Sequence, residues 1–198
     1  MKDMNRSDHI INVANRLILE KGYSAFSYAD VAAEIGIQKA SIHYHFPSKA
    51  NLVQNVVGRY RQEVRANLSK LDSLTNDPRE KLEQYLSYWE ASLQSKATDI
   101  CLCAQLASEI PILPEEVTRE IRGHFRDITD WLVRLLRDAA AENRFAGGEA
   151  PINEMAHSIL ASIHGGLLAS RAFNDARQFS MVKNRLMSLI NGKTTVAK

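Results

Sequence analysis

Two histidines, a tyrosine and a phenylalanine occupy four consecutive positions of this chain, as His43, Tyr44, His45 and Phe46. Imidazole nitrogens can bind a metal ion, and imidazole and phenol groups can also form hydrogen bonds with a nucleic acid. His43 and His45 are two residues apart, so on a helix they point about 200° away from each other and cannot bind one metal ion together. The spacing argues against a metal site and leaves three uses open: core packing, an ordinary polar helix face, or a surface that contacts another polymer.

The other residues that could do chemistry lie in the second half of the chain. Cys101 and Cys103 flank a single leucine, and His157 and His164 are seven residues apart, which places the two histidines on one face of a helix. With Glu109 as an acid or base, they are the best material for an enzyme, but no set of nucleophile, base and orienting residue and no triad of metal ligands appears. We therefore expect no catalytic residue, no metal and no cofactor, and histidines that line a pocket or a dimer seam.

Length and composition indicate a globular protein of one or two domains. The chain has 198 residues, of which 45% are hydrophobic and 24% charged. Its net charge is only +2, so any contact with nucleic acid must come from a local basic face. No apolar run approaches the ~20 residues of a membrane span. The N-terminal MKDMNRSDHI is polar, and two cysteines are too few for a disulfide scaffold, so we expect a cytoplasmic protein that makes no use of a membrane.

Helical periodicity runs through the chain, and no alternating apolar run bounded by turn residues indicates a strand. The pattern predicts an all-α fold of about nine helices. The predicted helices begin near Ile10, Ala29, Lys39, Ser48, Pro78, Ile100, Glu115, Pro151 and Ala176. We expect the first to stop at Gly22 and the last two to end near Phe173 and Asn191.

Two of the short helices are joined by a tight turn at Gly36-Ile37-Gln38, which is the layout of a helix-turn-helix. Gly36 supplies the left-handed conformation of the turn, and Ser27 with Asp30 three residues later forms a partial capping box at the start of the first of these two helices. Ile35, Ile42 and Phe46 are expected to anchor the second helix to the body. Its outward positions are then Gln38, Lys39, Ser41, His43, Tyr44 and His45, whose side chains have the length and polarity to reach bases and phosphates in a major groove.

The segment GYSAFSYADVAAEIGIQKASIHYHFPSKANLV resembles the DNA-binding domain of TetR/AcrR-type transcriptional regulators. The matched features are a Lys-Gly-Tyr stop, a Ser cap, Asp-Val-Ala, Ala-Glu-x-Gly-Ile and the ending Tyr-x-Phe-x-Ser-Lys-x-x-Leu. The resemblance implies an N-terminal three-helix DNA-binding domain at residues 1–50 and a C-terminal helical domain for ligand binding and dimerisation at residues 51–198. It also implies a repressor that a small molecule or an electrophile releases from a palindromic operator in double-stranded DNA. A helical adaptor that contacts proteins through the same motif is the alternative, and it would show no salt-sensitive affinity for DNA.

The resemblance also implies roles for individual residues at the DNA. Ser27 and Tyr28, at the start of the second helix, would contact or lie against a phosphate. The groove-facing set would be Gln38, Lys39, Ala40, Ser41 and His43, and the residues that grip the backbone would be Tyr44, His45 and Lys49. The family more often has Tyr at position 43 and Ser or Thr at position 38, which leaves the base preference and the helix cap open.

For the second half of the chain the resemblance implies a homodimer with a ligand pocket in each C-terminal domain. Small residues on the helix from Pro151 to Phe173 permit close helix contact, and with the last helix they favour an intersubunit four-helix bundle. The residues concerned are Ala156, Ala161, Gly165, Gly166, Ala169, Val182, Leu186 and Leu189. The alternative is that both helices pack within one chain.

The segment ICLCAQLASEI, followed by LPEEVTREI, resembles a branch of the family in which a cysteine senses electrophiles or oxidants. Cys101 is the better match of the two cysteines, which we expect on opposite sides of one helix. Simple packing is the alternative, because free cysteines are among the most buried residues and no Lys or Arg stands next to these two. The candidate effector-sensing residues are Cys101, Trp89 and His164.

Overall fold

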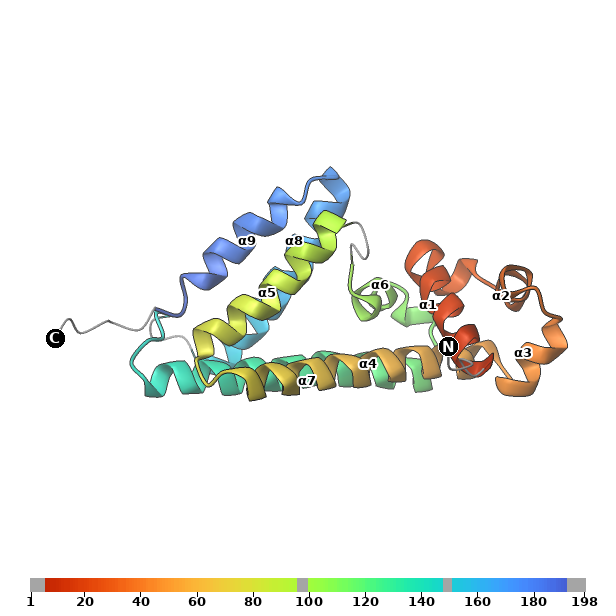
Figure 1. Cartoon of the computed structure of the whole chain (residues 1–198), viewed down its shortest axis with the longest axis horizontal. Helices are drawn as coiled ribbons and strands as arrows, with labels where there is room; N and C mark the ends of the chain where they lie inside the picture. Colours follow the sequence, from red (N-terminus) through yellow and green to blue (C-terminus); the bar gives the residue numbers. More distant parts are fainter. Residues whose placement is uncertain (1–5, 96–99, 148–150, 192–198) are drawn as a thin grey trace. The chain divides into compact units, whose positions relative to one another are not determined.

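The computed structural model describes residues 6–95, 100–147 and 151–191. Within these ranges the chain is all-α, as predicted, apart from an isolated antiparallel bridge between Phe145 and Ile190 (Figure 1). The helices are α1 (Arg6–Ala25), α2 (Tyr28–Ile35), α3 (Lys39–His45), α4 (Lys49–Leu74), α5 (Pro78–Ser95), α6 (Leu102–Ala107), the 3-10 helix η1 (Ile110–Ile112), α7 (Glu115–Ala141), α8 (Ile152–Phe173) and α9 (Arg177–Met187). No helix in the described ranges is long and apolar enough to cross a bilayer.

The chain divides into two compact units, and the first comprises Met1–Val64 and Leu102–Phe125. In this unit α1 packs against α2 and α6, and α2 packs against α3. Its core includes the buried side chains Ile10, Ile18, Phe26, Ile42, Leu52, Leu106 and Ile121. The unit therefore combines the helices of the predicted DNA-binding region with a segment from the second half of the chain. The domain boundary at residue 50 stays a prediction.

Local signals set the ends of the first two helices. Gly22 interrupts α1 with φ 77° and ψ 179°, where the sequence predicts a stop, and one further helical turn follows to Ala25. Ser27 and Asp30 form the predicted capping box at the start of α2. Gly36 ends α2 in the left-handed conformation, with φ 74° and ψ 35°. A side chain is strained in both glycine conformations, so the corners on either side of α2 depend on these two residues.

The second unit comprises Arg65–Cys101 and Arg126–Lys198. In it α8 packs along α9, and α5 lies against both helices (Figure 1). Its core contains the buried side chains Leu82, Leu86, Trp131, Ile159, Ile163, Leu167 and Phe179.

The last helix is shorter than the sequence predicts, because α9 ends at Met187 and not at Asn191. Two arginines donate hydrogen bonds to carbonyl groups at the end of this helix and just after it. The guanidinium of Arg79 donates to the carbonyl oxygen of Met187 at 2.7 Å and to that of Ile190, and Arg144 Nε donates to the carbonyl of Asn191 at 2.8 Å. Carbonyl groups held by charged donors no longer need a helical turn as partner, so the chain leaves the helix there.

Candidate nucleic-acid interface and buried cysteine site

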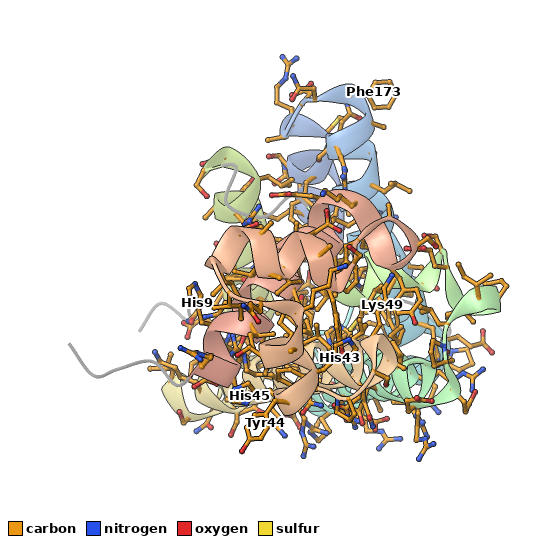
Figure 2. All side chains as sticks on the ribbon, turned by 90° about the vertical axis from the view of Figure 1, so that its right-hand side faces the viewer. His9, His43, Tyr44, His45, Lys49 and Phe173 are labelled. Atoms are coloured by element: carbon orange, nitrogen blue, oxygen red, sulfur yellow. The ribbon has the colours of Figure 1, made fainter. Side chains whose placement is uncertain are left out.

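One face of α3 is buried and the opposite face is open to solvent. Ile42 is 0% exposed and Phe46, directly after the helix, is 4% exposed, as expected for its anchors. The outward face carries Gln38, Lys39, Ala40, His43 and Tyr44 as exposed residues and Ser41 and His45 as half-buried ones. Figure 2 shows Tyr44 and His45 next to each other, and Tyr44 is 86% exposed. Of the groove-facing residues predicted from the sequence, Gln38, Lys39, Ala40 and His43 are exposed and Ser41 is half-buried.

Tyr28 lies beneath this surface. Its side chain is buried, its hydroxyl group donates to the carbonyl oxygen of Phe46 at 2.8 Å, and its ring contacts that of His43 with 4.7 Å between centroids. Burial, with the charge of Tyr23 as a second cause, raises the pKa of Tyr28 to about 12. Tyr28 thus ties α2 to the end of α3 and supports His43. Its hydroxyl group is occupied inside the fold, and the expected position of Tyr28 against a phosphate stays a prediction.

Ser27 is exposed at the start of α2, but its polar groups are directed to Asp30. The backbone N–H and the hydroxyl group of Ser27 both donate to Asp30 Oδ2, at 2.7 and 2.6 Å. These hydrogen bonds and that from Lys21 lower the pKa of Asp30 to about 2. A fixed carboxylate therefore occupies the first turn of α2, and a phosphate contact by Ser27 stays a prediction.

Lys49 has partners inside the fold, and the contact with the DNA backbone expected from the sequence stays a prediction. Its ammonium group donates to the carbonyl oxygen of Phe26 at 2.6 Å and lies 4.5 Å from the ring centroid of Tyr23 and 4.6 Å from that of Phe26. Burial lowers the pKa of Lys49, against the opposing charges of Glu109 and Asp30. A carbonyl and two aromatic faces hold the cation inside the unit. Any phosphate contact by Lys49 would have to compete with these partners.

Glu109 is the residue at this site that the sequence did not single out for a structural role. It lies in the turn between α6 and η1, and its carboxylate accepts hydrogen bonds from Tyr23 N at 2.6 Å, from Ser24 N at 3.0 Å and from Ser24 Oγ at 2.5 Å. The only local sign of this contact is Gly22, where a helix break leaves room for an anion. Nothing in the sequence indicates which anion comes to lie there.

The two cysteines are fully buried, and neither forms a disulfide. The expectation of two cysteines within one helix is wrong, because Cys101 comes directly before α6 and belongs to the second unit, whereas Cys103 lies in α6 and belongs to the first. His164 on α8 forms a hydrogen bond with Cys101, and its Nδ1 lies 2.9 Å from the carbonyl oxygen of Leu160. Burial alone would lower the pKa of His164, but Cys101 and the Leu160 carbonyl outweigh it, so the pKa is raised.

Trp89 approaches the same cluster through Tyr85 on α5. Both side chains are buried, Trp89 interacts with the Tyr85 side chain, and Tyr85 interacts electrostatically with Cys101. Burial raises the pKa of Tyr85, and Cys101 raises it further. The structure therefore brings together Cys101, His164, Tyr85 and Trp89, of which Tyr85 was not among the candidates. His157 does not join them: it is exposed and lines a polar groove with Arg134, Arg137 and Asn153.

Comparison of the sequence with known protein families identifies the family of this chain. Residues 10–56 match the family of bacterial regulatory proteins named tetR, and residues 78–186 match the tetracyclin repressor-like C-terminal domain. The chain belongs to the tetR family. The structure of this tetR-family protein accordingly combines a helix-turn-helix of a DNA-binding transcriptional regulator with the helical C-terminal domain of that family.

Individual relatives agree with this tetR-family assignment. A TetR-family transcriptional regulator from Agrobacterium tumefaciens superposes with a TM-score of 0.90 at 40% identity, over 94% of this chain and 97% of the other. The negative transcriptional regulator IcaR of Staphylococcus aureus, named for the biofilm operon icaADBC, is 25% identical over 192 residues, which are 93% of this chain and 96% of IcaR. The HTH-type regulator YerO of Bacillus subtilis is 26% identical over 197 residues; the match covers 94% of this chain but only 65% of YerO.

Proposed function

We propose that this tetR-family regulator is a homodimeric repressor that binds a palindromic operator and leaves it when an effector binds. The observation that carries the proposal is the exposed polar face of α3, which stands on the buried Ile42 and Phe46. In this proposal Gln38, Lys39, Ala40, Ser41 and His43 face the major groove, and Tyr44 and His45 contact the backbone. The name of IcaR, a negative regulator, supports repression.

The proposed dimer uses the outward face of α8 and α9. Two neighbouring glycines of α8 differ in their surroundings. A Cβ at Gly166 would lie 3.1 Å from Phe179 and Val182, so Gly166 allows close packing within the chain. Gly165 is exposed and has open space around it. Around that open face the helices expose large apolar side chains, namely Leu168 at 57%, Phe173 at 70% and Met181 at 59% (Figure 2 labels Phe173). Such a face is buried when two copies form a four-helix bundle.

The mechanism of release is geometric. Two recognition helices must lie about 34–36 Å apart to enter successive major grooves on one side of the DNA. An effector that binds more tightly to a dimer with another spacing shifts the population away from DNA, by no more than its difference in affinity for the two states.

A gel shift on the DNA that flanks the protein's own gene, at two salt concentrations, tests the proposal. We expect binding that weakens steeply with salt and a protected site with two symmetric halves. His43→Ala should relax the preference at one symmetric pair of positions in a selection from random DNA. Absence of salt-sensitive binding would contradict the proposal and favour a helical adaptor.

For the effector we propose an electrophile that reacts with Cys101. The Leu160 carbonyl can only accept a hydrogen bond, so Nδ1 of His164 carries the proton and Nε2 presents its lone pair. When the Cys101 sulfur adds to an electrophilic carbon of a quinone, the thiol proton passes to His164 and the quinone ring takes up the electron pair and then a proton. A quinone should release DNA from the wild type and from Cys103→Ser but not from Cys101→Ser. Equal release from Cys101→Ser would mean that both cysteines are packing residues and that the effector binds without a covalent bond.

A further inference from the structure

The end of α1 is held by a carboxylate from a distant part of the chain. Gly22 interrupts the helix, and the next two amides, of Tyr23 and Ser24, donate to the two oxygens of Glu109, with the hydroxyl group of Ser24 as a third donor. An anion that accepts hydrogen bonds from two consecutive amides and a hydroxyl group is favoured by these charge-assisted hydrogen bonds. Burial alone would raise the pKa of Glu109, but Ser24, Tyr23 and the charge of Lys49 lower it, so the carboxylate is ionised.

The fit between this carboxylate and the helix break is close. A Cβ built on Gly22 would lie 2.5 Å from Glu109 Oε1, closer than any side chain tolerates. Gly22 is therefore needed twice: for its positive φ of 77° and for the space that the carboxylate fills. The acid also attracts the ammonium group of Lys49, which lies against the Tyr23 and Phe26 rings.

The corner that Glu109 holds leads directly to the recognition helix. Ser27, which follows the corner by three residues, caps α2, and Tyr28 ties α2 to α3 through its bond to the Phe46 carbonyl and its contact with His43. Glu109 itself is fixed to α6, because its N–H donates to the carbonyl of Leu106 at 2.9 Å. The hydrogen bonds of Glu109, the short backbone segment from Ser24 to Ser27 and the contacts of Tyr28 thus connect the end of α6 with His43.

We infer that Glu109 is the positioning residue through which α6 sets the α1–α2 corner and, with it, the DNA affinity of α3. The carboxylate links the position of α6 to that of the recognition helix, since α6 cannot move alone without breaking three hydrogen bonds to an anion. This inference rests on the proposed DNA-binding function and adds to it the contact through which a change at α6 reaches the DNA. Sites coupled in this way affect each other equally, so DNA binding should also tighten the corner.

The experiment compares Glu109→Gln, Glu109→Ala and Ser24→Ala with the matched control Glu115→Gln in the full chain. Glu115 is an exposed acid at the start of α7, and its carboxylate pairs with the exposed Arg122, so its replacement leaves the corner intact. Amide hydrogen exchange at Tyr23 and Ser24 reports the corner directly, and the affinity for the operator fragment reports its effect. We expect exchange at these two amides to rise about tenfold or more in the Glu109 variants, with operator affinity at least fivefold lower, and Glu115→Gln unchanged. Operator DNA should slow exchange at the same amides in the wild type.

A merely structural Glu109 would give a different result. The variants would then unfold at a lower temperature, but once folded they would bind the operator within twofold of the wild type. DNA would also leave amide exchange at Tyr23 and Ser24 of the wild type unchanged. Unchanged operator affinity or unchanged exchange on DNA binding overturns the inference. If Glu109→Ala does not fold, Glu109→Gln keeps the shape and Ser24→Ala removes only one donor, so the comparison still decides. A wild type that binds no DNA would overturn the proposed function, whereas normal DNA binding with unchanged exchange in every variant overturns the Glu109 contact alone.

Discussion

Replacement of Lys49 by Met distinguishes two possible roles of this lysine, stabilising the fold through internal contacts and contacting a DNA phosphate. In the structure its ammonium group bonds to the Phe26 carbonyl and lies on the Tyr23 and Phe26 rings. A hydrogen bond from a charged group contributes about 1.5–3 kcal/mol and a cation–π contact about 0.5–1 kcal/mol, while burial of the charge opposes both. Met keeps the apolar stem, so we expect Lys49→Met to lose about 1–3 kcal/mol of unfolding free energy. The melting temperature should fall by about 2–4 °C per kcal/mol in a chain of this size.

Thermal unfolding and a salt titration of DNA binding, run on the same samples, check this prediction. Lys39→Met is the control, because Lys39 is exposed on the side of α3 that we propose faces the DNA. It should keep the melting temperature and reduce the salt slope by about 0.9 for each phosphate that is no longer neutralised. Lys49→Met should lower the melting temperature and leave the salt slope of DNA binding unchanged. An unchanged melting temperature with a reduced salt slope would show that Lys49 turns outward to a phosphate, and the reasoning from its internal partners would be refuted.

Three further changes test other parts of the fold. Gly22→Ala should lower the free energy of unfolding by about 1–3 kcal/mol because of the backbone conformation, and further because the new Cβ would lie 2.5 Å from a carboxylate oxygen of Glu109. The Gly22→Ala variant should therefore unfold at a lower temperature than Gly36→Ala, since Gly36 has a similar φ of 74° but open space around it. Equal losses of stability in the two variants would mean that the carboxylate moves aside freely. Tyr28→Phe should cost about 1–3 kcal/mol in urea unfolding, because a buried carbonyl loses its donor; wild-type stability would show that the hydroxyl contributes nothing. Arg144→Met should cost about 3–5 kcal/mol at pH 7, since it removes the guanidinium that pairs with the buried carboxylate of Asp77. Burial alone would raise the pKa of Asp77, but Arg144 and backbone hydrogen bonds outweigh it, so the pKa is lowered. The pair therefore stabilises the fold fully at pH values above the pKa of Asp77 in the unfolded chain. This stabilisation is lost as the pH falls through the lowered pKa of the folded state. The cost of Arg144→Met should therefore shrink in acid, and a cost independent of pH would contradict the pairing.

The parts of the fold that were predictable depend on short-range signals. Ser27 and Asp30 are three residues apart, and Gly36 stands where the turn needs a left-handed residue, so the start and the end of α2 can be read directly from the sequence. The spacing of Ile42 and Phe46 identifies the buried side of α3 and leaves its opposite side exposed. In these cases the residues that interact are also near one another in the chain.

The rest depends on partners that the sequence does not indicate. Lys49 has the same sequence context whether its ammonium group faces solvent or the Phe26 carbonyl, and only packing of the two rings decides between them. Glu109 meets Tyr23 across 86 residues, which no helical period reveals. The early end of α9 likewise follows from Arg79, whose bond to the Met187 carbonyl spans 108 residues.

The makeup of the first compact unit affects how regulators of this kind can be recombined. Engineers who build hybrid repressors join the DNA-binding part of one protein to the sensing part of another, and a junction near residue 50 looks natural from the sequence. Here such a graft would discard Leu102–Phe125, which packs with α1 and carries the acid that fills the Gly22 break. The DNA-binding unit that would have to be transferred from this chain therefore consists of two separate sequence segments. A successful hybrid has to carry this second segment across, or receive a host whose own α6 is followed by an acid that can serve the same glycine.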